Sequence, residues 1–144
     1  MKSKICIIQA TYYPEISKML FEGATRELIK KGIIDKNLDE FLDPKWQVPG
    51  IFELPIVIAK NIENYDAFIA LGCVIKGKTP HFEFISKATI NSIMNLSTKF
   101  IKPIGNGIIT CLNKKQALER SNPTKKNKGG EAANAVIKLL KNLN

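Results

Sequence analysis

The chain has 144 residues, 44% of them hydrophobic, which is typical of one domain with its own core, so we expect a single domain over residues 1–144. No apolar run approaches the roughly 20 residues of a membrane span, and residues 5–8 are too few for a secretory signal, which favours a cytoplasmic protein. The net charge of +9 would suit nucleic acid, but the dense lysine group at residues 125–128 lacks aromatic neighbours for base stacking. We therefore expect neither a membrane nor a nucleic-acid partner, and a phosphorylated small molecule instead.

The first half of the chain alternates a strand pattern with a helix pattern. Residues 5–9 are apolar and β-branched, and residues 15–31 repeat apolar residues at helical spacing. Gly32, which follows two lysines, is typical of a residue just beyond a helix end. A strand near residues 45–48 and a helix near residues 52–62 follow, with Pro55 tolerable only in the first helical turn.

The second half repeats this order. Residues 67–74 and 104–110 are predicted strands, and residues 82–96 and 132–143 are predicted helices. The acidic residues 35–43 and the polar residues after the last strand are expected to be connections. This βα order predicts an α/β fold, a three-layer sandwich with a mainly parallel four-stranded sheet of the flavodoxin-like type.

Ligands of such sheets bind beyond the carboxyl ends of the strands, so the segments that follow each strand are the candidate binding segments. In residues 77–81, Thr79 is a good N-cap and Pro80 suits the first helical position, which predicts an anion site at a helix start. His81, the only histidine, would stand beside that anion, where an imidazole can transfer protons near neutral pH. A lone histidine is also compatible with a structural role, and its segment alone does not separate the two.

The three cysteines, Cys6, Cys73 and Cys111, are odd in number and widely spaced. This usage suits buried thiols in a reducing compartment better than a disulfide framework. No second cysteine or histidine lies at ligand spacing, so we expect no zinc or other metal site.

Four separated blocks of the chain resemble those of the 6,7-dimethyl-8-ribityllumazine synthase family, in the same order and spacing. They are residues 49–55 (PGIFELP), 70–82 (ALGCVIKGKTPHF), 116–120 (QALER) and 127–133 (NKGGEAA). The resemblance spans nearly the whole chain. It implies a transferase of riboflavin biosynthesis that joins 5-amino-6-ribitylaminouracil to 3,4-dihydroxy-2-butanone 4-phosphate, without a cofactor or metal.

The resemblance also implies roles for residues around the pyrimidine substrate. Tyr12 matches the aromatic residue that stacks on the ring, and a π-face suits a flat heterocycle. Glu53 would accept hydrogen bonds from the ribityl hydroxyls. The remaining matched positions of the pyrimidine and ribityl subsite are Ile51, Phe52, Cys73, Val74 and Ile75, the last three through their backbone groups.

The phosphate side of the site is implied in the same way. Lys78 and Thr79 match the phosphate-binding turn, and His81 matches the proton-transfer residue. Arg120 matches the phosphate-clamping arginine, whose planar fork can bind phosphate through two hydrogen bonds, and Lys128 matches a lysine nearby.

This chain differs from many members of the family at one site position, and the resemblance also implies how the chain assembles. Asn106 stands where many members carry an aromatic residue that faces the pyrimidine from a neighbouring subunit, so a polar contact is expected there. The family assembles as pentamers with active sites between subunits, and we expect a homopentamer here. The start of the chain close to its first strand, the loop around Pro123 and the high charge favour a free pentamer over a 60-subunit shell.

Three other functions stay open on the residues alone. A flavodoxin-like FMN-binding or phosphate-binding module would share the βα order, and a non-catalytic lumazine-binding or riboflavin-binding relative would share the blocks as well. A nucleic-acid binder would show affinity that falls steeply with salt. Turnover of both substrates separates the enzyme from all three.

Overall fold

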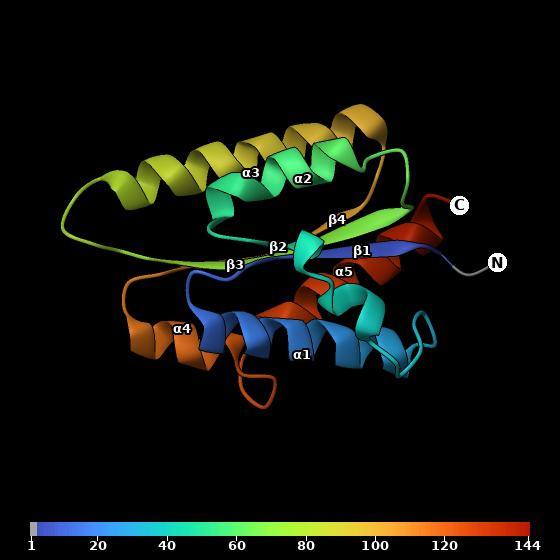
Figure 1. Ribbon diagram of the computed structural model, residues 1–144, viewed down its shortest axis with the longest axis horizontal. Coiled ribbons are helices and arrows are strands. Elements are labelled where there is room, and N and C mark those ends of the chain that lie inside the picture. The colour runs from blue at the N-terminus through green and yellow to red at the C-terminus, as the bar shows by residue number, and fades with distance from the viewer. Residues whose placement is uncertain (1–2) are drawn as a thin grey trace.

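A computed structural model describes residues 3–144 and shows an all-parallel, four-stranded sheet with helices on both faces (Figure 1). The strands lie in the order β2-β1-β3-β4 and are β1 (Ile5–Ala10), β2 (Gln47–Val48), β3 (Ala67–Ile75) and β4 (Ile104–Cys111). One face carries α2 (Leu54–Lys60) and α3 (His81–Phe100), and the other carries α1 (Pro14–Lys30), α4 (Lys114–Ser121) and α5 (Lys128–Asn142). The predicted three-layer α/β sandwich is confirmed.

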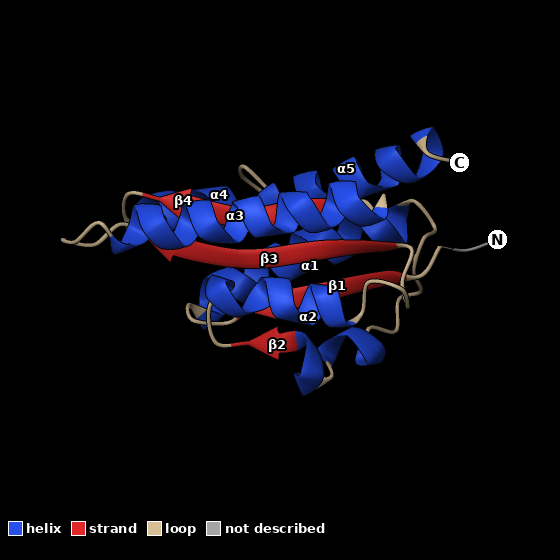
Figure 2. Ribbon diagram, turned by 90° about the horizontal axis from the view of Figure 1, so that it is seen from above, coloured by secondary structure: helices blue, strands red, loops and turns tan. Residues whose placement is uncertain are grey.

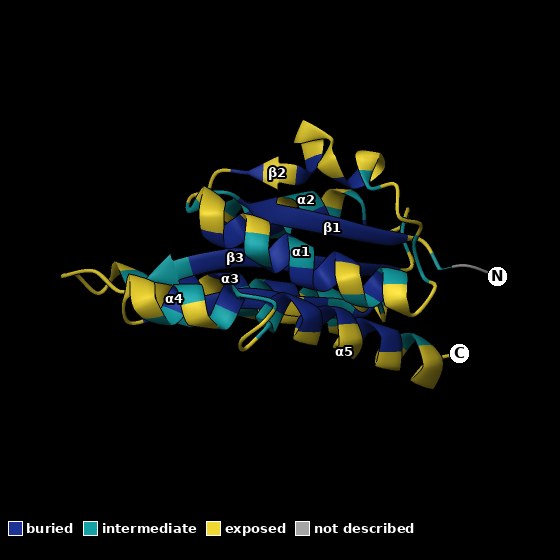
Figure 3. Cartoon of the chain, turned by 90° about the horizontal axis from the view of Figure 1, so that it is seen from below, coloured by how far each residue is buried: buried dark blue, intermediate teal, exposed yellow. Residues whose placement is uncertain are grey.

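The central strands are apolar because helices cover both of their faces. Every residue of β1 is buried, as is most of β3, and Figure 3 shows both strands almost entirely in the colour of buried residues. Leu20 and Val136 are among the residues that pack one face, and Leu54 and Ile58 pack the other. Each such side chain stabilises the fold by about 1.5–3 kcal/mol when fully buried.

Helix α1 follows its sequence pattern closely. The predicted inner residues Ile16, Leu20, Ala24 and Leu28 are all buried. Gly32 has a φ of 71°, the left-handed conformation that terminates helices and that glycine adopts without strain.

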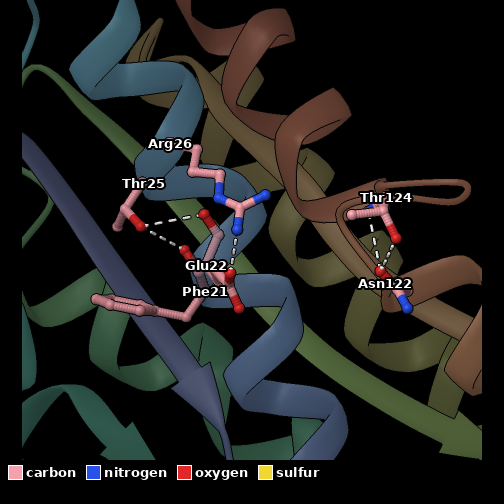
Figure 4. Close-up of polar contacts among 6 residues, drawn as sticks. All are labelled: Phe21, Glu22, Thr25, Arg26, Asn122 and Thr124. Atoms are coloured by element: carbon pink, nitrogen blue, oxygen red, sulfur yellow. Dashed lines mark hydrogen bonds and ion pairs between the residues drawn. The ribbon is translucent and has the colours of Figure 1, made fainter.

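On the same helix, polar side chains bond locally (Figure 4). Arg26 forms an ion pair with Glu22 one turn earlier, and the Thr25 hydroxyl donates to the Phe21 carbonyl oxygen at 2.8 Å. Both ionic partners are exposed, so the pair contributes little stability.

Helix α4 was not predicted, because its polar residues show no apolar stripe. Only Ala117 and Ser121 of this helix are buried. A local signal was nevertheless present. Asn113 caps the helix by accepting from the Gln116 N–H at 2.9 Å, and the Gln116 side chain accepts from the Leu112 N–H at 2.8 Å. The prediction of a polar connection here was therefore wrong.

Other segments are shorter than predicted or contain 3-10 helices that were not predicted. Strand β2 has two residues and follows a 3-10 helix, η2 (Pro44–Trp46). The helix expected near residues 52–62 begins as a 3-10 helix, η3 (Ile51–Glu53), before α2, and Pro55 lies in the first turn of α2 as required. The acidic connection contains a third 3-10 helix, η1 (Asp39–Leu42), anchored by the buried side chain of Phe41.

The boundaries of two long helices also differ from the prediction. Helix α3 continues to Phe100, beyond the predicted end at residue 96. Helix α5 begins at Lys128, where the Asn127 side chain accepts from the Gly130 N–H at 3.2 Å. Of its last predicted inner residues, Leu140 packs against the core, whereas Leu139 and Leu143 are exposed.

The connections leave β1 and β3 toward opposite faces of the sheet. The chain passes from β1 to α1 on one face and from β3 to α3 on the other, so the loops diverge at the carboxyl ends of these adjacent strands. Divergence of this kind opens a crevice where ligands bind in α/β sheets. The described part of the chain begins just before β1 and ends after α5, and both of these points lie at the opposite end of the strands (Figure 2).

The contact between α1 and α5 depends on a residue without a side chain. A Cβ added to Gly129 would lie 2.0 Å from the Leu20 carbonyl oxygen, which belongs to the α1 backbone and cannot rotate away. We therefore expect Gly129→Ala to lower the free energy of unfolding by about 3 kcal/mol, which exceeds the helix propensity gained. Chemical denaturation measures this, with Gly77→Ala, which meets nothing within 4 Å, as the control. Equal stability of Gly129→Ala and the unmodified chain would contradict the close helix contact.

Candidate functional site

A cavity of about 420 Å³ opens at the carboxyl ends of β1, β2 and β3, in the crevice where the connections diverge. Residues from three separate loops and from the start of α3 line it. The predicted site residues that it brings together are Tyr12, Ile51, Phe52, Glu53, Cys73, Val74, Ile75, Thr79 and His81. These predicted residues, which are up to 69 positions apart in the sequence, therefore meet around one small volume.

The loop after β2 is held in place by a capping interaction. The Glu53 carboxylate accepts a hydrogen bond from the Gly50 N–H at 2.8 Å, which winds residues 51–53 into the 3-10 helix η3. Ile51 points into the core, whereas the Phe52 ring is exposed. A carboxylate accepts several hydrogen bonds, so the bond to Gly50 leaves Glu53 able to accept others from the hydroxyls of a ligand.

The start of α3 differs by one residue from the prediction. His81 is the first helical residue, and Pro80 takes the cap position, where its carbonyl oxygen accepts from the Glu83 and Phe84 N–H groups at 3.1 and 3.2 Å. Thr79 is thus not the N-cap, and no side chain caps the helix. The first amides of α3 stay available to an anion at this end, and His81 is exposed beside them.

Further residues, which lie in or beside the candidate segments but were given no site role from the sequence, also line the cavity. They are Tyr13, Pro49, Gly50, Gly77, Phe82 and Ile85. Each lies in a loop after a strand or in the first turns of α3, so its position in the sequence was compatible with a place in the site. The residue types alone did not indicate a role in binding or catalysis. Tyr13 contributes a second ring beside Tyr12.

The other predicted site residues lie outside this cavity. Arg120 lies on α4, and its Nη1 donates to the Thr110 carbonyl oxygen at 3.1 Å. Asn106 is exposed on the edge strand β4, where its Oδ1 accepts from the Ile108 N–H at 3.1 Å. Lys128 forms an ion pair with Glu131 at 3.1 Å in the first turn of α5. Lys78 is exposed in the loop before α3, next to the lining residues Gly77 and Thr79.

The cavity lining described above contains no arginine or lysine. One chain thus offers two separate sets of predicted residues. The first set, which includes the aromatic residues and Glu53, lies around the cavity at β1, β2 and β3. The second set, which consists of Asn106, Arg120 and Lys128, lies on β4 and the helices after it.

Cys73 lines the cavity, and Cys111 of the neighbouring strand β4 contacts its side chain. Burial raises the pKa of Cys73 to about 12, and the neighbouring Cys111 adds to this effect. Burial also raises the pKa of Cys111, against the opposing influence of the Arg120 guanidinium. All three thiols of the chain are free and buried, as the cysteine spacing predicted.

This environment predicts low thiol reactivity, because the thiolate is the reactive form. We expect iodoacetamide at pH 8 to leave Cys73 unmodified in the folded chain and to modify it fully in urea. Raising the pH should increase labelling of the folded chain only as the pH approaches the pKa of about 12. Mass spectrometry of the labelled peptides measures both, and rapid labelling of folded Cys73 at pH 8 would contradict a protonated thiol.

Within residues 3–144, no group of three or more histidine, cysteine, aspartate or glutamate side chains is placed to hold a metal ion. No helix in the same range is long and apolar enough to cross a membrane.

The strand order and the diverging connections define a flavodoxin-like α/β protein, and its cavity lies at the carboxyl ends of the strands, where proteins of this class bind ligands. Residues 2–144 match the sequence profile of 6,7-dimethyl-8-ribityllumazine synthase. The chain is 41% identical to the 6,7-dimethyl-8-ribityllumazine synthase of Erythrobacter litoralis, covering 96% of this chain and 94% of that protein. It is 38% identical to 6,7-dimethyl-8-ribityllumazine synthase 1 of Rhodopseudomonas palustris, covering 96% and 85%. The chain belongs to the 6,7-dimethyl-8-ribityllumazine synthase family.

Proposed function

We propose that this chain catalyses the reaction that names its family, in riboflavin biosynthesis. It joins 5-amino-6-ribitylaminouracil to 3,4-dihydroxy-2-butanone 4-phosphate and releases the lumazine, phosphate and water. The observation that carries this proposal is the cavity that unites Tyr12, Glu53 and His81 at the carboxyl ends of the strands.

The lining suits the pyrimidine substrate in shape and polarity. The exposed rings of Tyr12 and Phe52 offer flat apolar surfaces to a heterocycle, and the Glu53 carboxylate offers acceptors to the ribityl hydroxyls. The backbone of Cys73, Val74 and Ile75 runs along the cavity wall, where amide groups can bond the edge of the ring. Cys73 acts here through its backbone, because its thiol stays protonated.

The chemistry requires proton transfer and an anion clamp more than a strong nucleophile. The substrate amine attacks the ketone and loses water to form an imine, phosphate is then eliminated, and ring closure with loss of a second water completes the lumazine. His81 transfers protons, while Thr79, Lys78 and the free amides of α3 bind the phosphate. Holding two substrates together in the cavity supplies much of the rate.

Assembly completes this site in our proposal. The cavity lies toward the β2 side of the sheet, whereas Asn106 and Arg120 lie on the β4 side, at the opposite edge. A head-to-tail contact would bring the second set of one subunit to the cavity of the next, and such contacts close into rings when the rotation permits. We propose a homopentamer in which Asn106, Arg120 and Lys128 of a neighbouring subunit complete each site.

An apolar surface on the α2 and α3 side supports this assembly. Several large hydrophobic side chains of η3, α2 and α3 and at the end of α3 are exposed, and contact with a neighbouring subunit would remove them from water. They are Phe52, Ile56, Phe84, Met94 and Ile101.

The activity is tested by incubating the protein with both substrates and following lumazine fluorescence and inorganic phosphate. Formation of both products supports the proposal. Binding of the lumazine without turnover would instead identify a binding protein of the same family, and the polar Asn106 in place of an aromatic residue is the feature that favours this second candidate.

The shared site is tested by light scattering and by subunit mixing. A mass of about five chains agrees with the pentamer, whereas a monomer that is active contradicts the shared site. His81→Ala and Arg120→Ala subunits, each inactive alone, are dissociated, mixed and reassembled. Some interfaces then pair an intact His81 with an intact Arg120 and should regain activity, which a site contained in one chain would not do.

A further inference from the structure

The side chain of Tyr12, the proposed stacking residue, is largely exposed to solvent. It lies in the turn between β1 and α1, lines the cavity, and is 71% exposed. An exposed ring samples several rotamers, and a ligand that stacks on it must select one of them. That selection costs binding free energy unless the protein has already oriented the ring.

The neighbouring ring of Tyr13 supplies such an orientation. The ring centroids of Tyr12 and Tyr13 are 4.9 Å apart with an interplanar angle of 80°, a T-shaped contact of the kind that aromatic pairs prefer.

Both the ring and the backbone of Tyr13 contact neighbouring parts of the chain. Its ring is half-buried and packs against the core cluster that includes Ile16 and Cys73. Its carbonyl oxygen accepts from the Ser17 N–H at 2.9 Å, and Pro14 follows it at the start of α1. A fixed ring therefore stands beside a free one at the mouth of the cavity.

We propose that Tyr13 is a positioning residue that orients the ring of Tyr12 for stacking on the heterocycle. The proposal rests on the proposed function, because it takes Tyr12 as the stacking surface. Tyr13 acts through its ring and not through its hydroxyl. Burial, with Cys73 and Tyr12 nearby, raises the pKa of that hydroxyl, which therefore stays neutral while the substrates react.

A double-mutant cycle tests the coupling between the two rings. The probe is 6,7-dimethyl-8-ribityllumazine, titrated by its fluorescence, and KM for the pyrimidine substrate is measured alongside. Tyr13→Leu keeps an apolar side chain but removes the ring. It should raise both the Kd for the lumazine and the KM for the pyrimidine substrate by about two- to tenfold. Tyr13→Phe keeps the ring and should stay within about twofold of the unmodified chain. In a Tyr12→Leu background, Tyr13→Leu should cause no further loss.

Several outcomes overturn the proposal. Equal losses in Tyr13→Leu and Tyr13→Phe would mean that the hydroxyl contacts the ligand directly. Additive losses in the double variant would mean that the rings act independently. If Tyr13→Leu does not fold, Tyr13→Ser replaces it, because serine is a favoured N-cap for α1 and also lacks the ring.

The test separates this proposal from the proposed function. KM for the butanone phosphate should stay unchanged in the Tyr13 variants, whereas general damage to the site would raise both KM values. If the unmodified chain binds the lumazine without turnover, the catalytic proposal fails while the binding cycle still decides the role of Tyr13. If it binds no lumazine, both proposals fail.

Discussion

Replacing His81 with alanine should lower kcat by about 10²- to 10⁴-fold, the usual contribution of a general acid or base. His81 lines the cavity at the first residue of α3, and it is the only histidine of the chain. A loss of this size requires that the proposed proton transfers pass through the imidazole. Steady-state kinetics with both substrates saturating measures the effect directly.

The matched control is Glu83→Ala, which removes an exposed charged side chain from the same helical turn but does not line the cavity. Its kcat should stay close to that of the unmodified chain. A folded His81→Ala variant with unchanged kcat would remove this residue from the mechanism. A loss much smaller than expected would instead indicate that holding the substrates together supplies most of the rate.

Replacing Arg120 with alanine should raise KM for the butanone phosphate about 10- to 150-fold, because a charge-assisted hydrogen bond worth about 1.5 to 3 kcal/mol is lost. KM for the pyrimidine should change far less, since Arg120 is proposed to bind only the phosphate. Arg120→Lys should restore the affinity only in part, because an ammonium group cannot form the planar two-bond contact.

Arg120 also bonds to Thr110 in its own chain, so its structural contribution must be measured separately. Thermal unfolding of Arg120→Ala gives this contribution, and Lys115→Ala on the same helix provides an exposed, cationic control. Equal increases in KM for both substrates, together with a lower unfolding temperature, would show that Arg120 supports the fold and does not bind phosphate.

Local sequence patterns were sufficient where a segment is buried along its length. The apolar runs of β1 and β3 and the stripe of Ile16, Leu20 and Ala24 in α1 face the core, so burial and pattern agree. The pattern failed for α4, because that helix buries small and polar residues such as Ala117 and Ser121. It also failed for the exact start of α3, because Pro80 and not Thr79 is the N-cap residue, and the Pro80 carbonyl oxygen accepts the first hydrogen bonds of the helix.

The sequence by itself determined the fold class and the family, because these depend on local periodicity and on the order of motifs along the chain, and it supplied the candidate site residues. Only the tertiary structure decided which of these candidates line one cavity. Strand β1 lies between β2 and β3, and this arrangement gathers Tyr12, Glu53 and His81 around one cavity. The same strand order leaves Arg120 and Asn106 on the β4 side, a separation across the sheet that distances along the chain do not encode.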